Sequence, residues 1–293
     1  MNVTDVDKLA DSFAGISLEE LVGQAALLTR LDNKYLVPRD AFAELVSRLG
    51  GDYLALDIDG RRCFAYDTVY FDGQQLPSYY AHLQRRRKRF KARSRHYLDS
   101  SRCVLEIKLR GGRGETVKRQ LAWDPALHGQ LTPAGRAFLE LSVQEAYGRP
   151  TDAVLSPMLH TSYRRLTIVH RELAQRLTCD FDLLLSGTDR TARMDPELVL
   201  VESKSELGRG VADLLLHRLR LHPINASKYC LGIALTRPDI RNNDFRHVLR
   251  HFQAVRSTRP QWTVARPSAP RGGEKSLGVS KDLGHSRADA HNP

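Results

Sequence analysis

Basic residues recur at every second position within the segment Arg85–Leu121, a spacing that can gather positive charge on one surface. Lys91, Arg93 and Arg95 alternate with small or neutral residues, and Lys108 stands between leucine and isoleucine side chains. Side chains on a β-strand alternate between two faces, so each run predicts a strand with one cationic face. Guanidinium and ammonium groups bind phosphate oxygens. A concave surface built from such strands is stable only if water or a polyanion compensates it.

Three later segments are predicted to be strands that also carry charge on one face. They cover residues 160–169, 176–185 and 198–204. The charged and polar positions on these faces are Tyr163 and Arg165, then Arg176, Thr178, Asp180 and Asp182, and finally Glu202 and Lys204. The sequence leaves open whether Asp180 and Asp182 are buried ion-pair partners of arginines or metal ligands.

Helices are predicted around these strands, and most strands follow one another through short turns. A serine cap and early glutamates predict a helix at 17–28, and apolar spacing predicts others after Pro133, at 211–221 and at 245–255. We therefore predict an α+β fold, an antiparallel closed β-barrel with surrounding helices. Residues 1–16 are expected to form a flexible N-terminus, 17–256 the folded domain, and 257–293 a disordered C-terminal tail.

The chain has 293 residues and a formal net charge of +11, which favours an anionic partner. Four scattered cysteines without a CxxC pair favour a reducing cytoplasm over a disulfide framework or a zinc site. We expect a cytoplasmic protein without a transmembrane segment, because no apolar run approaches the roughly 20 residues that span a bilayer. No aromatic-interleaved RNA motif or helix-turn-helix pattern occurs, so no specific nucleic-acid partner is expected.

Several short motifs occur in one order along the chain. They are RLDNKY from Arg30, YDTVYFD from Tyr66, KARSRHY from Lys91, LEIK from Leu105, TSYRR from Thr161, RLTCDFD from Arg176, LVESK and SKY at Ser227–Tyr229. As an ordered set they resemble the VTC domain, the catalytic domain of polyphosphate polymerases, within the CYTH-like triphosphate tunnel metalloenzymes. The resemblance covers roughly residues 30–252. It implies a tunnel of strands lined by basic residues that hold a polyphosphate chain.

The resemblance also implies roles for individual residues of this chain. Arg93, Arg95, Lys108, Arg165, Arg176 and Lys228 are implied catalytic residues, with Lys34, Tyr163 and Ser227 as substrate-binding residues and Glu202 as the ligand of a divalent metal, Mn²⁺ or Mg²⁺. ATP is the implied substrate and polyphosphate the implied product. Eukaryotic relatives work within membrane complexes, so a membrane protein partner is conceivable.

Two positions depart from the family pattern. Asn225 stands where eukaryotic members carry a second lysine, and Asp32 lies in a segment where many tunnel enzymes have more glutamates. Fewer carboxylates suggest weaker metal dependence or a different balance between synthesis and hydrolysis. The leading hypothesis is an ATP-dependent polyphosphate polymerase. The alternatives are a triphosphate or polyphosphate hydrolase on the same tunnel and a non-catalytic polyphosphate-binding module.

The run Arg85–Arg89 precedes the first alternating strand. Its simplest interpretation is a solvated surface segment. A patch where a polyanion enters and a nucleic-acid contact are the other interpretations that the sequence leaves open.

Overall fold

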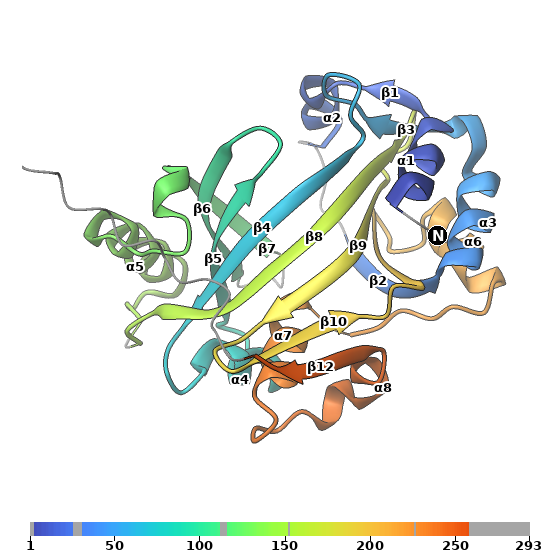
Figure 1. Ribbon diagram of the computed structural model, residues 1–293. Coiled ribbons are helices and arrows are strands. Elements are labelled where there is room, and N and C mark those ends of the chain that lie inside the picture. The colour runs from blue at the N-terminus through green and yellow to red at the C-terminus, as the bar shows by residue number, and fades with distance from the viewer. Residues whose placement is uncertain (1–2, 26–30, 112–115, 152, 226, 258–293) are drawn as a thin grey trace, which may run out of the picture. The chain divides into compact units, whose positions relative to one another are not determined.

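Figure 1 shows the computed structural model, which describes residues 3–25, 31–111, 116–151, 153–225 and 227–257. All of them belong to one unit by their contacts, Met1–Thr263. The tail that the sequence predicts to be disordered lies outside the described residues, except for Ser257. No helix in the described part is long and apolar enough to cross a bilayer.

The described strands form one 12-stranded sheet. They are β1 (Ala14–Ile16), β2 (Leu31–Pro38), β3 (Tyr53–Leu56), β4 (Cys63–Asp72), β5 (Phe90–Tyr97), β6 (Arg102–Arg110), β7 (Thr116–Trp123), β8 (Ser156–His170), β9 (Arg176–Ser186), β10 (Arg190–Met194), β11 (Leu198–Ser205) and β12 (Phe252–Arg256). The strands with charged faces follow the order β7-β6-β5-β4-β8-β9-β11-β2, each antiparallel to the next. Strands β10 and β12 continue from β9, and β3 and β1 from β8.

The predicted α+β class and antiparallel sheet are confirmed, whereas closure of the barrel is not. Within the described residues no pairing joins β7 to β2, so these strands are the two ends of the charged series. The outer edge of β2 is used differently: the Ile224 N–H donates to the Lys34 carbonyl at 2.7 Å. The Lys34 carbonyl therefore already accepts a hydrogen bond, and pairing of β2 with β7 to close the barrel would need acceptors on this edge.

Helices pack on both sides of the sheet, and several of them cover its outer side (Figure 1). The α-helices are α1 (Val3–Asp11), α2 (Leu18–Ala25), α3 (Arg39–Leu49), α4 (Pro77–Leu83), α5 (Pro133–Tyr147), α6 (Val211–Arg218), α7 (Lys228–Thr236) and α8 (Arg246–Leu249), with short 3-10 turns η1 (Gly50–Asp52), η2 (Pro125–Leu127) and η3 (Asn243–Phe245). Helices α1, α3 and α6 bury apolar residues of β2, β9 and β11, and α5 buries those of β6. Since the apolar faces are buried under helices, the charged faces are left on the inner side of the sheet.

The N-terminus differs from the prediction of a flexible segment. Helix α1 packs Val6 and Ala10 into the core, followed by Phe13, with exposed fractions of 0%, 1% and 4%. Strand β1 then pairs in parallel with β3. Val6 and Ala10 are four residues apart and therefore lie on one face of α1, and burial of that face together with Phe13 orders the segment.

The segment 245–255 also differs from its prediction, which was one closing helix. It contains η3, the short α8 and then β12. Strand β12 forms because it pairs along the free edge of β10, from Arg190↔Arg256 to Met194↔Phe252. A tertiary pairing partner therefore overrides the local helical pattern.

A bulge in β9 changes which residues share its inner face. The register between β8 and β9 shifts between Ser162 and Arg164, and Asp182 has a left-handed φ of 55°. Asp180 stays on the inner face, whereas Asp182 accepts a hydrogen bond from Arg164 Nε at 3.0 Å on the outer side. The prediction that Asp182 shares the face of Asp180 is therefore wrong, because the bulge adds one residue to the alternation.

Candidate functional site

Strands β5, β6 and β7 form one wall of the candidate site, with matching charged positions in register. Their inner residues form rows across the three strands, and successive rows are two residues apart. One row is Arg93, Glu106 and Gln120, and the next is Lys91, Lys108 and Lys118. This register confirms that the alternation in the sequence gathers the basic side chains on a common face.

The first row is neutralised internally. Arg93 forms an ion pair with Glu106, whose other carboxylate oxygen accepts from Gln120 Nε2 at 3.0 Å. Glu106 is only 1% exposed. Burial opposes its ionisation, but the nearby Arg93, followed by Arg95 and Lys108, lowers the pKa of Glu106 to about 2. The carboxylate is therefore ionised at neutral pH and fixes the Arg93 guanidinium.

A second buried ion-pair group joins β8, β9 and α7. Arg165 donates to both oxygens of Asp180, from Nε at 2.6 Å and from Nη2 at 2.9 Å. Lys228, the first residue of α7, forms an ion pair with the same carboxylate. Despite burial, these two cations keep the pKa of Asp180 below its usual value. Of the two roles left open for Asp180, the structure supports the ion-pair role.

Aromatic rings of β4 and β8 line the space between these groups. Tyr163 stacks on Tyr66 with ring centroids 5.3 Å apart, and Arg165 lies 5.2 Å from the Tyr163 ring. Arg95 donates to the Tyr163 hydroxyl at 3.0 Å and to Thr68 Oγ1 at 3.2 Å. Cations over ring faces are held in place without a carboxylate. Arg95 is thus ordered at 7% exposure although it forms no ion pair with a described residue.

Strands β2 and β11 form the opposite wall. Their register pairs Glu202 with Lys34 and Lys204 with Asp32. The Lys204 ammonium contacts both carboxylates, Glu202 and, at 2.8 Å, Asp32. Arg176 of β9 stands beside Lys204 in register. Burial opposes the charge on Glu202, yet Lys204 followed by Lys34 and Lys108 keeps its pKa far below the usual value.

The two walls act on each other electrostatically although they share no hydrogen-bonded strand pair. Burial and then Arg93 lower the pKa of Lys108 to about 7, and Glu202 and Lys204 of β11 are among the other groups that act on it. Burial likewise lowers the pKa of Lys118 on β7, where Arg176 of β9 contributes repulsion. Charges act on each other in this way only when they are close together, because water and salt screen distant pairs. We call the inner space that these side chains share the lumen.

The cations of the lumen other than Arg176 fall into two groups. The paired cations, each with an ion pair to a carboxylate, are Arg93, Arg165, Lys204 and Lys228. The unpaired cations, for which no described carboxylate forms an ion pair, are Lys34, Lys91, Arg95, Lys108 and Lys118. Arg95 is buried, Lys34, Lys91 and Lys108 are half-buried, and Lys118 is exposed. Unpaired charge with reduced access to water is unfavourable by itself, so this second group indicates a site for an anion.

Nine of the ten residues that the resemblance implied come from the inner faces of β2, β5, β6, β8, β9 and β11 or from Lys228 of α7. The tenth, Ser227, caps α7: its Oγ accepts from the Cys230 N–H at 3.2 Å. Asn225 is exposed, one residue after Ile224, which binds the edge of β2.

Three cations of the lumen were missed by the sequence-based choice of site residues. They are Lys91, Lys118 and Lys204. Lys91 and Lys204 stand two residues from Arg93 and Glu202, so the period of two already contained the signal for both. Lys118 could be found only through the pairing of β7 with β6, which places it beside Lys108.

The metal implied by the resemblance fits part of this arrangement. Lys204 places its ammonium between Glu202 and Asp32, so these carboxylates already favour a cation at that position. Within the described residues no group of three or more His, Cys, Asp or Glu side chains could hold a metal ion. Mg²⁺ commonly uses one or two carboxylates together with water and substrate phosphates. Glu202 and Asp32 could therefore hold a divalent ion only together with other oxygens and in competition with Lys204.

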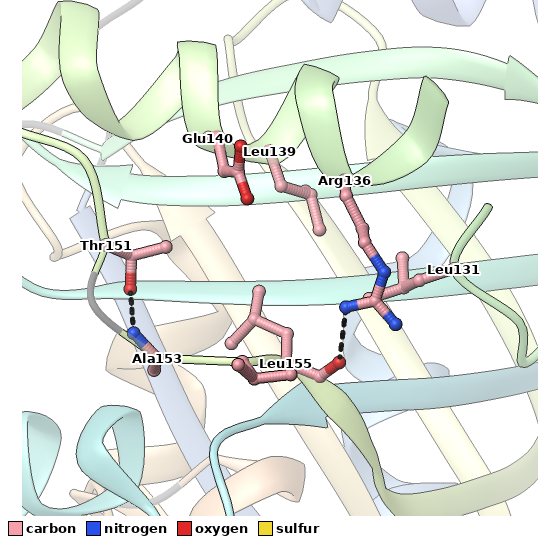
Figure 2. Close-up of a pocket in the computed structure, with 8 residues that line it drawn as sticks. Leu131, Arg136, Leu139, Glu140, Thr151, Ala153 and Leu155 are labelled. Carbon is pink, nitrogen blue, oxygen red and sulfur yellow. Dashed lines mark hydrogen bonds between the residues drawn. The ribbon is translucent and has the colours of Figure 1, made fainter. Parts of the chain in front are cut away.

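The pocket drawn in Figure 2 is a different feature. It has a volume of about 370 Å³ and is lined by α5 and the segment that follows it. Arg136 donates to the Leu155 carbonyl there at 3.1 Å, and Glu140 is the other charged residue of the lining. None of the lumen residues lines it. With a single cation bound to a backbone oxygen, it lacks the convergent polar groups of a phosphate site.

A histidine cluster lies on the outer face of β4. Asp67 Oδ1 accepts hydrogen bonds from His160 Nε2 at 2.5 Å and His128 Nε2 at 3.2 Å. Despite burial, these two histidines lower the pKa of Asp67. The cluster connects β8 and the turn after η2 to β4 on the outer face of the sheet, and so stabilises the strands that form the lumen.

Comparison with known proteins gives the family. The model of the VTC domain matches residues 29–237. The chain belongs to the VTC domain family. That match covers every lumen residue named above, from Asp32 to Lys228. No curated protein matches this chain in sequence.

Solved structures with a similar fold have low sequence identity to this chain. A candidate adenylate cyclase from Bacillus halodurans has 15% identity and a TM-score of 0.41, over 68% of this chain and 94% of that one. A candidate adenylyl cyclase from Hippeastrum, described as having a dominant triphosphatase activity, has 16% identity and a TM-score of 0.39, over 71% and 96%. The family assignment depends on the sequence match alone.

Proposed function

We propose that this VTC-domain protein is a polyphosphate polymerase that transfers the γ-phosphate of ATP to a growing polyphosphate chain in its lumen. The observation that carries the proposal is the set of unpaired cations on facing walls of one lumen, among them Lys34, Arg95 and Lys108. A polyanion with regularly spaced charges supplies the compensation that these groups lack. Family membership supports a triphosphate or polyphosphate as that anion.

The chemistry follows from charge and position. A terminal phosphate oxygen of the chain attacks the γ-phosphorus of ATP, a new P–O bond forms, and the bond to the β–γ bridging oxygen breaks, so that ADP leaves. Phosphoryl transfer of this kind needs alignment and neutralisation of charge, and no protein nucleophile. Arg93 and Arg165 suit this task because Glu106 and Asp180 fix their guanidinium groups before substrate arrives.

Other residues would position the phosphates. Lys34, Lys91, Lys108 and Lys118 would bind the chain along the two walls, and Lys228 would approach it from the start of α7. A positive helix end favours anions, although the Lys228 charge is shared with Asp180. Glu202 and Asp32 would hold a divalent ion, which would neutralise charge on phosphate oxygens when bound.

A product assay tests the proposal against its alternatives. The purified protein is incubated with ATP and Mn²⁺, and in parallel with tripolyphosphate and Mn²⁺, and products are separated by chain length. A polymerase yields ADP and lengthening chains. Release of orthophosphate without chain growth would instead identify a hydrolase, and tight binding without turnover a binding module. Arg95→Ala should lower chain growth by at least tenfold, whereas the exposed Arg193→Ala should not change it.

A further inference from the structure

A cluster of exposed cations continues the charged rows of the lumen outward. Residues Arg85–Lys88 are exposed and Arg89 is half-buried, and Arg110 at the end of β6 is exposed. Within the described residues, Arg85, Arg86, Lys88, Arg89 and Arg110 form no ion pair with a carboxylate. We call these five residues the basic rim.

The rim is in register with the lumen. Arg89 directly precedes β5 and stands two residues before Lys91, and Arg110, the last residue of β6, follows Lys108 by two. The Arg110 N–H donates to the Arg89 carbonyl at 3.0 Å, which extends the β5–β6 pairing by one step. Arg89 and Arg110 therefore form the next row after Lys91 and Lys108, about 7 Å further along the strands.

Electrostatic effects link this row to its neighbours. Burial and then Arg110 lower the pKa of Arg89. Burial also lowers the pKa of Lys91, and Lys34, Arg93 and Arg89 act on it as like charges. Like charges this close repel each other unless an anion lies among them. The positive potential is therefore continuous from inside the lumen to the exposed rim.

The rim is held in place by backbone contacts. The Tyr147 hydroxyl at the end of α5 donates to the Arg89 carbonyl at 2.6 Å and accepts from the Arg110 N–H at 3.1 Å. Lys88 Nζ donates to the Tyr147 carbonyl at 2.9 Å. The N–H groups of Arg85 and Arg86 bind carbonyls of α4, at 3.1 Å and 2.9 Å. A solvated basic run needs no such anchoring.

We propose that the basic rim is a docking surface for the part of a polyphosphate chain that extends beyond the lumen. The inference rests on the proposed function, since it takes the same polyanion as the occupant. Regular negative charge complements the unpaired cations of the rim, and the shared register directs a chain from Lys91 and Lys108 onto Arg89 and Arg110. A short anion bound among the deeper lumen cations contacts few rim residues, whereas a long chain contacts several, so the rim selects for chain length.

A binding experiment with two ligands tests this. Tripolyphosphate and a long polyphosphate chain are titrated against the wild type and a variant with Arg85→Gln, Arg86→Gln and Arg110→Gln. The affinity for the long chain should fall about tenfold at low salt and by less at high salt, since exposed charge pairs are screened. The affinity for tripolyphosphate should not change.

The matched control removes three exposed arginines elsewhere, with Arg193→Gln, Arg218→Gln and Arg246→Gln, and should leave both affinities unchanged. Equal melting temperatures of the two variants show that both are folded. Unchanged long-chain binding in the rim variant overturns the inference, as does an equal loss in the control. If the rim variant loses binding to phosphatidylserine vesicles but not to long polyphosphate, the inference is wrong and the rim binds a membrane surface instead. If the wild type binds neither phosphate ligand, the proposed function itself fails.

Discussion

The paired and unpaired cations occupy the same lumen but differ in what holds them. Arg93 and Arg165 each face a carboxylate that is 1% exposed, Glu106 or Asp180. Lys91 and Lys108 form no ion pair with a described carboxylate, and burial lowers the pKa of both. The paired groups are thus part of the folded structure, and removing one partner destabilises it. The unpaired groups are unfavourable for the free energy of folding when no anion is bound, and a bound anion compensates their charge.

This difference separates stability from binding in a testable way. Substitutions at paired cations or their carboxylates should change the free energy of unfolding. Substitutions at unpaired lysines should change mainly the affinity for phosphates. Proteins commonly exchange stability for function at sites of this kind.

The largest effect is expected for Asp180→Asn. This change leaves Arg165 and Lys228 buried without their carboxylate, and breaking a buried ion pair costs about 3–5 kcal/mol. The melting temperature should fall on the order of 10 °C. Scanning calorimetry measures this, and added tripolyphosphate should stabilise the variant more than the wild type because the anion replaces the missing charge.

Asp182→Asn is the matched control on the same strand. Asp182 is 38% exposed and pairs with Arg164 at 2.9 Å and, at the longer distance of 3.8 Å, with Arg39. Arg39 keeps its hydrogen bond to the Pro196 carbonyl in this variant, so the expected loss is about 1 kcal/mol. Equal losses in the two variants would contradict the distinction between the lumen and the outer face.

Lys108→Met should weaken tripolyphosphate binding roughly tenfold at pH 6, without loss of stability, because a charged contact is lost and a buried repulsion is relieved. The pKa of Lys108 is lowered to about 7 from 10.5. The unfolded chain therefore binds more protons than the folded one between these values, and this residue makes stability rise with pH across that window. Below pH 7 Lys108 is protonated in both the folded and the unfolded chain, so its charge destabilises the folded state to the full extent.

The affinity of the wild type should fall as pH rises through about 7, since Lys108 loses its proton. The ratio of wild-type to variant affinity, measured by calorimetry at pH 6 and pH 9, cancels the titration of the ligand. That ratio should shrink toward one at pH 9. The exposed Lys8→Met serves as control, with a ratio near one throughout. A constant tenfold ratio at both values would show that Lys108 stays charged.

Much of the lumen could be predicted because a strand has a strict period. The alternation around Arg93 and Lys108 fixed the inner faces of β5 and β6, and an apolar outer face indicated that helices would cover it. Val6 and Ala10 of α1 had a readable helical spacing too. The prediction of a flexible N-terminus did not use that spacing.

Other features depend on contacts between distant segments, which no local pattern contains. The bulge that turns Asp182 outward arises from the pairing of β8 with β9. The pairing of Arg93 with Glu106 could be read from two alternating strands, but that of Lys228 with Asp180 required the position of α7. The outer edge of β2 contacts Ile224 and is not paired with β7, and this too depends on a distant segment. A division into paired and unpaired cations therefore emerges only from the assembled structure.

An effect of about the same size as that of Lys108→Met concerns Lys204, which differs from the other paired cations because it bridges two carboxylates. Lys204→Met leaves Glu202 and Asp32 facing the lumen without the ammonium between them. The affinity for Mn²⁺ in the absence of substrate should rise roughly tenfold, the equivalent of about 1.4 kcal/mol. Electron paramagnetic resonance of free Mn²⁺ measures this without depending on activity.

Lys204→Arg keeps the positive charge and should not increase Mn²⁺ affinity, whereas adding Glu202→Gln to Lys204→Met should remove the increase. Mn²⁺ should also raise the melting temperature of Lys204→Met more than that of the wild type, because the ion relieves repulsion between the two carboxylates. Unchanged Mn²⁺ affinity in Lys204→Met would show that these carboxylates do not form a cation position. In that case a metal in the lumen would be held by substrate phosphates, and Lys204 would belong with the paired arginines as a structural group.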